Sequence, residues 1–402
     1  MQTASLRQDA RVIGLVGMAH GVSHFYHLIL AAVFPWLKPA FGLSYAELGL
    51  LMTVFFVISG VGQALAGFVV DRVGALRVLI GGLALLGIAA LVLAGAQSYP
   101  MLMAGSLVAG MGNSVFHPAD YTLLNQRVSK ARLAHGFSVH GISGNIGWAA
   151  APAFLGGVAA MSSWRTAVLV SAIIPFVMVS LLLLNRAALR ADPPAAKPSG
   201  HVQEGAFAFL RLPTVWMCFG FFFLSAIALG GIQSFASASL IALYHVTLAS
   251  ATTAYTAYML ASAGGMVAGG FIATRALNHD RTIMISFALA AALAVLLAMA
   301  VAPGWMVVPL MGAIGLASGV AGPSRDLMIR AAAPANATGR VFGVVYSGLD
   351  TGLSVGPLMF GALMDAHHPS WVFLCIGLFQ ALAIVTAVGV GSSKRAPVLQ
   401  KA

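Results

Sequence analysis

Long apolar stretches separated by short polar segments dominate the chain. Residues 78–98, 166–185 and 371–391 contain no charged side chain. Each stretch is about the 20 residues that an α-helix needs to cross the roughly 30 Å hydrocarbon core of a bilayer. The pattern therefore predicts membrane-spanning helices.

Twelve such helices are expected along the chain. The predicted spans are 12–38, 46–70, 77–98, 100–126, 136–160, 164–185, 212–243, 249–273, 282–302, 304–330, 338–364 and 369–391. A polar, proline-containing stretch, 186–211, lies between the sixth and seventh spans and reads as a cytoplasmic linker. We therefore expect an all-α integral membrane protein with one six-helix bundle in 1–185 and a second in 212–402, the latter ending in a short cytoplasmic tail.

The two halves repeat one another at offsets of about 203 to 207 residues. Pro118 falls against Pro323, and Pro152 falls against Pro357. A parallel repeat of six helices predicts two pseudo-symmetric bundles with a solute path between them that opens alternately to each side.

Composition and charge fit this topology. Of 402 residues, 60% are hydrophobic and 8% are charged, which is too little charge to cover a water-soluble domain. With the N-terminus inside, the 21 Lys and Arg residues minus Lys38 and Arg165 leave 19 on the cytoplasmic side. Basic loops resist translocation, so both termini are expected in the cytoplasm of a bacterial inner (plasma) membrane. The net charge of +11 therefore reflects topology, and no nucleic-acid partner is expected.

Several other features are expected to be absent. No cleavable signal peptide is expected, because the first apolar stretch continues past Pro35. Cys218 and Cys375 lie in apolar runs and are read as small hydrophobes, so no metal site is expected. Neither a P-loop nor a dinucleotide fingerprint occurs, so no cofactor is expected and an ion gradient must drive any transport.

A charged, glycine-containing motif joins the second and third spans. It runs Gly67-Phe-Val-Val-Asp71-Arg72-Val-Gly74-Ala-Leu-Arg77. This run resembles the G-x-x-x-D-R-x-G-x-x-R loop of the major facilitator superfamily, which implies a transporter fold and a gating role. Asp71 is expected to make charge-assisted contacts with Arg72 and Arg77 that hold the cytoplasmic gate in one state. The alternative is a solvated turn, and in the second half Thr274 replaces the acid.

Two spans carry glycine–proline motifs. The fifth contains Gly141-x-x-Gly144-Asn145-x-Gly147 followed by Pro152, and the eleventh contains Gly352-x-x-x-Gly356-Pro357-x-x-x-Gly361. The first is similar to the fifth-helix motif of proton-coupled drug antiporters of the superfamily, although Ala151 replaces the glycine before the proline. The resemblance implies antiport, and plain helix packing is the alternative.

A further run, Gly112-Asn113-Ser114-Val115-Phe116-His117-Pro118, together with His20 and Asn145, resembles the fosmidomycin-resistance branch of the superfamily. Two departures matter: Ala119 and then Asp120 follow the His-Pro pair where that branch has an acid directly, and His24 stands about where it has an acid. The resemblance implies a non-enzymatic transporter, expected as a monomer, but the drug is not carried over as its substrate.

Ionisable groups inside a membrane are costly, at least roughly 2.5 to 3.5 kcal/mol each by insertion scales, so each needs a partner or a task. His20, His24 and His27 recur at i, i+4 and i+7 and share one helical stripe. Such a row can bind an anionic substrate or pass protons, because histidine titrates near neutrality. The alternative is a set of neutral hydrogen-bonding groups that join the first span to its neighbours.

The fourth and eleventh spans supply candidate proton sites. His117 and Asp120 share one face, and Asp120 is expected either to carry a proton or to pair with Arg127 or cap a helix. Asp350 lies about halfway along its span and is a candidate for both proton coupling and substrate binding, or for a structural ion pair.

The remaining candidates are polar side chains in four spans. Arg325 is the best cation for an anionic substrate, or it forms an inner gate with Asp326. Further uncharged contacts to a substrate are expected from Asn113, His140, Asn145 and Gln233, for which interhelical hydrogen bonding is the alternative.

The leading prediction is a proton-coupled secondary transporter of a small organic solute, anionic or drug-like, working as an efflux antiporter. The alternative is a proton-symport importer of a small carboxylate or phosphonate. A membrane enzyme is disfavoured because the candidate residues are spread over many spans, and a receptor is disfavoured because no soluble signalling domain is evident. The expected partners are the solute, protons and the lipid bilayer.

Overall fold

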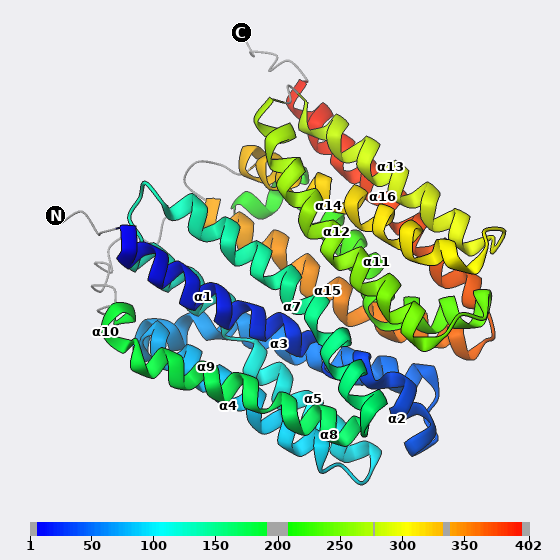
Figure 1. Ribbon diagram of the computed structural model, residues 1–402. Helices are drawn as coiled ribbons and strands as arrows, with labels where there is room; N and C mark the ends of the chain where they lie inside the picture. The colour runs from blue at the N-terminus through cyan, green and yellow to red at the C-terminus, as the bar shows by residue number, and fades with distance from the viewer. Residues whose placement is uncertain (1–5, 191–207, 276–277, 333–337, 396–402) are drawn as a thin grey trace. The chain divides into compact units, whose positions relative to one another are not determined.

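The computed structural model describes residues 6–190, 208–275, 278–332 and 338–395, and every element assigned within these ranges is a helix. The chain divides into two compact units, Met1–Ser199 and Gly200–Ala402 (Figure 1). Most of the predicted linker lies outside the described residues. Its described flanks are the short helices α10 (Arg186–Leu189) and η2 (Ala208–Arg211).

The first unit contains the first six predicted spans. Its elements are α1 (Leu6–His27), η1 (Ala31–Val33), α2 (Phe34–Phe41), α3 (Tyr45–Val73), α4 (Ala75–Ala94), α5 (Tyr99–Asn113), α6 (Phe116–Arg127), α7 (Leu133–Met161), α8 (Trp164–Ser171) and α9 (Ile173–Leu184). Three spans are broken here: α1 and α2 form the first, α5 and α6 the fourth, and α8 and α9 the sixth.

The second unit contains the other six. Its elements are α11 (Pro213–Tyr244), α12 (Leu248–Arg275), α13 (His279–Ala298), η3 (Gly304–Met306), α14 (Val307–Ala332), α15 (Thr338–Asp365) and α16 (Pro369–Arg395). Within the described ranges, each of the twelve predicted spans thus corresponds to a helix or a broken helix, which confirms the predicted fold class.

Within the described residues, eight helical segments are long and apolar enough to cross a membrane, and one of them consists of α8 and α9 together. The pair α1 and α2 would make a ninth span, bent by 46°. The other segments, α5–α6, α7 and α15, are short or carry polar side chains along their length. The candidate residues of the first unit are therefore concentrated in its least apolar spans.

Prolines explain the broken spans. Pro118 has no N–H to donate to the carbonyl of Ser114. The break between α5 and α6 lies at Ser114. Pro175 acts in the same way between α8 and α9, and Pro35 does so at the start of α2. The first predicted span, 12–38, is therefore a bent pair of helices, because α1 ends at His27.

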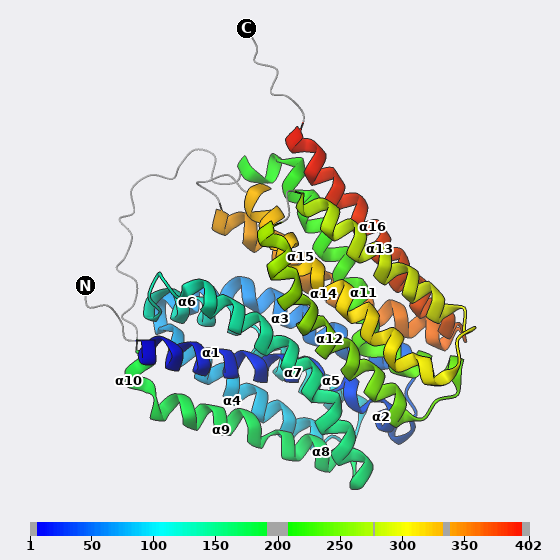
Figure 2. The same ribbon diagram turned by 45° about the horizontal axis from the view of Figure 1, so that its top comes forward.

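The same helix pairs pack together in each unit (Figure 2). In the first unit α1 packs against α7, α3 against α5, and α4 against α9. The equivalent pairs in the second unit are α11 with α15, α12 with α14, and α13 with α16. The internal repeat of the sequence is therefore also a repeat of packing.

Glycines allow the closest of these approaches. A Cβ at Gly147 of α7 would overlap the carbonyl oxygen of Gly21 in α1. A Cβ at Gly352 of α15 would likewise overlap the carbonyl oxygen of Phe223 in α11. Both glycine–proline motifs therefore pack helices closely, which is the alternative drawn from their spacing.

Candidate functional site

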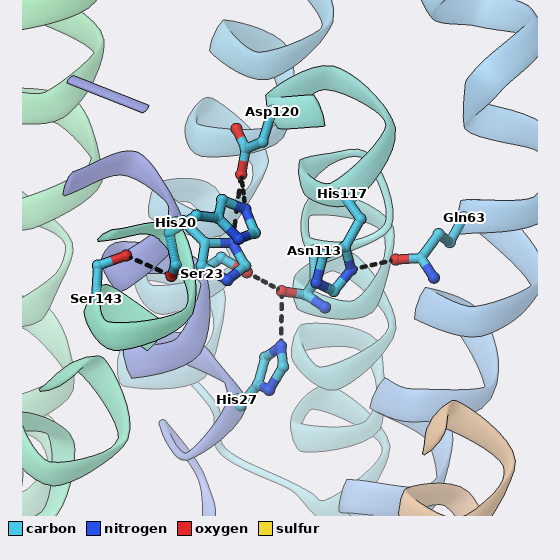
Figure 3. Close-up of polar contacts among 9 residues, drawn as sticks. His20, Ser23, His27, Gln63, Asn113, His117, Asp120 and Ser143 are labelled. Atoms are coloured by element: carbon cyan, nitrogen blue, oxygen red, sulfur yellow. Dashed lines mark hydrogen bonds and ion pairs between the residues drawn. The ribbon is translucent and has the colours of Figure 1, made fainter. Parts of the chain in front are cut away.

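Six titratable side chains of the first unit lie close together, five of them buried and His117 half-buried. Figure 3 labels four of the six, namely His20, His27, His117 and Asp120. This histidine cluster consists of His20, His24 and His27 from α1, His117 and Asp120 from α6, and His140 from α7. Its central residues are almost completely shielded: His20 is 2% exposed, His140 is 3% exposed and Asp120 is 0% exposed. The structure thus brings together residues up to 120 positions apart, since 140 minus 20 is 120.

Local features of the sequence explain this convergence. The i, i+4, i+7 spacing places the three α1 histidines on one stripe, and neighbouring rings in the row are 4.3 Å and 4.6 Å apart between centroids. The break at Pro118 puts His117 and Asp120 in the first turns of α6. Glycines of α7 hold that helix against α1 and so bring His140 to the same place.

Asp120 lies at the centre of the cluster. Its Oδ2 is 3.2 Å from His140 Nε2 and 3.3 Å from His20 Nδ1. The His20 and His140 rings are stacked, with centroids 3.4 Å apart and planes 22° apart. Asp120 does not pair with Arg127, whose Nε donates instead to the carbonyl of Ala188 at 2.9 Å, so that alternative is wrong.

Asn113, at the end of α5, joins three helices by hydrogen bonds. Its Oδ1 accepts from Ser23 Oγ at 2.6 Å and lies 3.1 Å from His27 Nε2, while its Nδ2 donates to Ser59 Oγ at 2.8 Å. Trp148 Nε1 donates to His27 Nδ1 at 3.2 Å. Because Nδ1 accepts, the proton of neutral His27 must be on Nε2, which donates to Asn113.

The cluster is extended by residues that the sequence reasoning missed. Gln63 Oε1 of α3 lies 2.7 Å from His117 Nδ1, and the Tyr121 ring lies 5.0 Å from that of His140. Gln63 is a polar residue well inside a predicted span, and that signal could have identified it.

Three buried polar atoms of the cluster have no hydrogen-bond partner in the part of the chain that the structure describes. They are His20 Nδ1, His24 Nδ1 and Asp120 Oδ1. The 3.3 Å approach of His20 Nδ1 to Asp120 is therefore an electrostatic contact without hydrogen-bond geometry. Gly144 leaves room for His24, because a Cβ there would lie 2.5 Å from His24 Nδ1.

The other substrate-site candidates lie on α7, α11 and α15. Asn145 Nδ2 donates to the carbonyl of Gly141 on its own helix at 3.2 Å. Gln233 is buried in α11 of the second unit, and within the described residues neither of its amide atoms has a partner. Asp350 is half-buried in α15.

Arg325 contacts Asp326 and Phe222 within the second unit. Its Nε donates to Asp326 Oδ1 at 2.9 Å, and its guanidinium lies over the Phe222 ring, 4.8 Å from the centroid. Asp326 is 44% exposed, so this is a weakly stabilising ion pair at a partly hydrated position. It is the pairing given above as the alternative to anion binding.

The expected contacts of the gate motif are not formed. Asp71 and Arg72 in α3 and Arg77 in α4 are all exposed, and within the described ranges none of the three makes an ion pair or hydrogen bond. Gly67 has open space beside it, and Gly74 ends α3 with a φ of 95°, a left-handed conformation that favours glycine. The gating role of these residues stays a prediction.

A different acidic residue of the first unit, Asp9, is held by hydrogen bonds. Asp9, at the start of α1, is buried and accepts hydrogen bonds from Arg132 Nε and Ser129 Oγ, both at 2.6 Å. The sequence reasoning did not pair these residues, which are more than 100 positions apart.

The sequence of this chain is similar to those of known proteins. The sequence profile of the Major Facilitator Superfamily matches residues 15–276 and again 219–401. The chain is 27% identical over 152 residues to the fosmidomycin resistance protein of Escherichia coli (strain K12), a match that covers 37% of each chain. It is 29% identical over 187 residues to the 3-(3-hydroxy-phenyl)propionate transporter of the same organism, covering 45% of each. The matched segments thus span less than half the length of these relatives.

A solved structure resembles the chain over almost its whole length. It is the crystal structure of a bacterial homolog to the human lysosomal transporter Spinster, in an inward-facing and occupied conformation. The TM-score is 0.74 at 13% sequence identity, and the match covers 97% of this chain and 96% of that one. At that identity the likeness concerns the fold alone.

Proposed function

We propose, from the premise that this chain belongs to the Major Facilitator Superfamily, that it couples the movement of protons to that of a small organic solute. The family consists of transporters, so the chain is a multi-pass membrane transporter of small solutes and not an enzyme. The proposal adds the proton, the outward direction of transport, a monomeric state, and a bacterial inner membrane with both termini in the cytoplasm.

The position of Asp120 carries the proposal of proton coupling. This carboxylate is 0% exposed in a membrane-spanning segment, and it lies within 3.3 Å of nitrogens of His20 and His140. A charged group at such a depth needs a partner or a task. A proton held between one carboxylate and two imidazoles would keep the group close to neutral, and its release to water would require the site to open.

The proposed direction of transport rests on the similarity of the chain to named relatives. The relative named as a fosmidomycin resistance protein supports an efflux antiporter. The relative named as a 3-(3-hydroxy-phenyl)propionate transporter supports the alternative, proton symport of a small carboxylate or phosphonate, for which Arg325 offers a fixed positive charge.

Proteoliposomes with an imposed pH gradient separate these two schemes. The solutes are chosen by a thermal-shift screen of drugs, phosphonates, carboxylates and sugars. Fosmidomycin and 3-(3-hydroxyphenyl)propionate are the first solutes to test. A vesicle that is acid inside accumulates solute by antiport, whereas a vesicle that is acid outside accumulates it by symport. Accumulation that ignores the pH gradient would refute proton coupling.

The Asp120→Asn variant tests the residue itself. We expect it to lose accumulation driven by the pH gradient and to retain solute exchange without a gradient, because the amide keeps the size of the side chain but cannot release a proton. Asp365→Asn, at the end of α15, is the matched control and should behave as the wild type. Gradient-driven rates in Asp120→Asn equal to those of the wild type would remove Asp120 from the mechanism.

The gate motif is a separate proposal, supported by its resemblance to the superfamily loop. Replacement of Asp71 by Asn should lower the turnover rate more than it weakens substrate binding. Transport kinetics and equilibrium binding on the same preparation would distinguish the two effects, and a loss confined to binding would contradict the gating role.

A further inference from the structure

The histidine cluster contains two sets of side chains with the spacing of metal ligands. The first set is His20, Asp120 and His140, and the second is His20, His24 and His117. Within each set the ligand atoms lie within 4.8 Å of one another. His20 belongs to both sets. His24 and His117 are therefore the candidate further ligands of an ion held by the first set.

The measured distances match tetrahedral coordination. Metal–ligand bonds of about 2.0–2.1 Å place neighbouring tetrahedral donors about 3.3–3.4 Å apart. Asp120 Oδ2 lies 3.3 Å from His20 Nδ1 and 3.2 Å from His140 Nε2. To bind one ion through both nitrogens, the stacked His20 and His140 rings, whose planes are 22° apart, must turn so that their in-plane lone pairs converge on it.

The unpartnered atoms of the cluster are an independent observation. In the described part of the chain His20 Nδ1, His24 Nδ1 and Asp120 Oδ1 make no hydrogen bond, although their residues are 2%, 9% and 0% exposed. A buried polar group that is left unsatisfied destabilises the fold. A cation bound by His20 Nδ1 would satisfy one of these atoms, and coordination through both oxygens of Asp120 would satisfy a second.

We propose that His20, Asp120 and His140 bind one divalent transition-metal ion in the first unit. Two imidazoles and one carboxylate suit Zn²⁺, Co²⁺ and Ni²⁺, whereas Mg²⁺ and Ca²⁺ favour sets made of oxygen alone. The expectation of no metal site considered the two cysteines as ligands and did not foresee that α1, α6 and α7 would meet. The site does not depend on proton-coupled transport, because an ion can bind there whether or not the chain moves protons.

The test is a Co²⁺ titration of the full chain, purified in detergent with its affinity tag removed and treated with EDTA. We expect one Co²⁺ per chain, with the strong visible absorption of a tetrahedral site that Zn²⁺ abolishes by displacement. His140→Ala and Asp120→Asn should each weaken binding at least about tenfold. His135→Ala is the matched control, because His135 lies on the same helix α7 but is exposed, and it should leave binding unchanged.

Two outcomes would overturn the proposal. Wild-type protein that binds neither Co²⁺ nor Zn²⁺ refutes it directly, whatever the variants do. Stoichiometric binding that survives in both His140→Ala and Asp120→Asn places the ion elsewhere and also refutes it. His20→Gln is a second variant that keeps a polar side chain of similar size. A monodisperse profile in size-exclusion chromatography shows that a loss of binding is not a loss of fold.

Discussion

Gly144→Ala tests how closely α1 and α7 approach at the histidine cluster. The new Cβ would lie 2.5 Å from His24 Nδ1 and 2.6 Å from its Cε1, whereas ordinary contacts begin at 3.4 Å. The His24 ring must therefore move by about 0.9 Å, the difference between 3.4 and 2.5 Å. Overpacking of this kind costs about 1–3 kcal/mol.

The same substitution at Gly157 provides the control. Gly157 lies on the same helix, is exposed, and has nothing within 4 Å of an added Cβ. Both variants gain up to about 1 kcal/mol of helix propensity, so their difference isolates the clash with His24. In detergent we expect the Tm of Gly144→Ala to fall roughly 2–10 °C below that of Gly157→Ala, and its transport rate to fall as well.

One result would refute the reasoning. If the two alanine variants have equal Tm values and equal transport rates, His24 is not packed against α7 at Gly144. A fall in transport with no fall in Tm would instead mean that the ring moves at little cost and that its position matters for the solute or the proton.

Three further predictions concern other residues of the described structure. Trp148→Phe keeps an aromatic ring but removes the N–H that donates to His27, so we expect a loss of about 0.5–1.5 kcal/mol in thermal denaturation and a change in the ¹⁵N shift of the His27 ring. Asp9→Asn should cost about 1 kcal/mol of stability, because the charge-assisted bond to Arg132, whose side chain is 31% exposed, is lost; an unchanged Tm would mean that this pair is not stabilising. Asp350→Asn should impair proton-driven transport in proteoliposomes while leaving the Tm near that of the wild type, and normal transport would remove Asp350 from the mechanism.

The fold was accessible from the sequence because its signals are local. Stretches of about 20 apolar residues identify spans without knowledge of what they pack against. The basic residues of the loops give an orientation, and the i, i+4, i+7 spacing places the α1 histidines on one stripe. Even the broken fourth span has a local cause, since Pro118 is visible in the sequence.

The contacts of the site could not be predicted from the sequence as well as the fold, because they depend on how the helices are rotated and where they meet. Asp120 has Arg127 two turns away on its own chain segment, yet its partners are His20 and His140 from two other helices. The hydrogen bonds of Asn113 likewise come from residues 54 to 90 positions away. Such pairings follow from the close approach at the α7 glycines, which the spacing indicated without specifying the facing residues.

The hydrogen bonds and ring contacts of the histidine cluster come from α1, α3, α5, α6 and α7, and all of these helices belong to one compact unit. A rigid-body displacement of one half of the protein would therefore leave every interatomic distance in the cluster as it is. What such a displacement can alter is whether bulk water or a solute reaches these side chains. Spectroscopic probes of hydration at His20, such as solvent isotope exchange, should then report the transport cycle better than probes of distance.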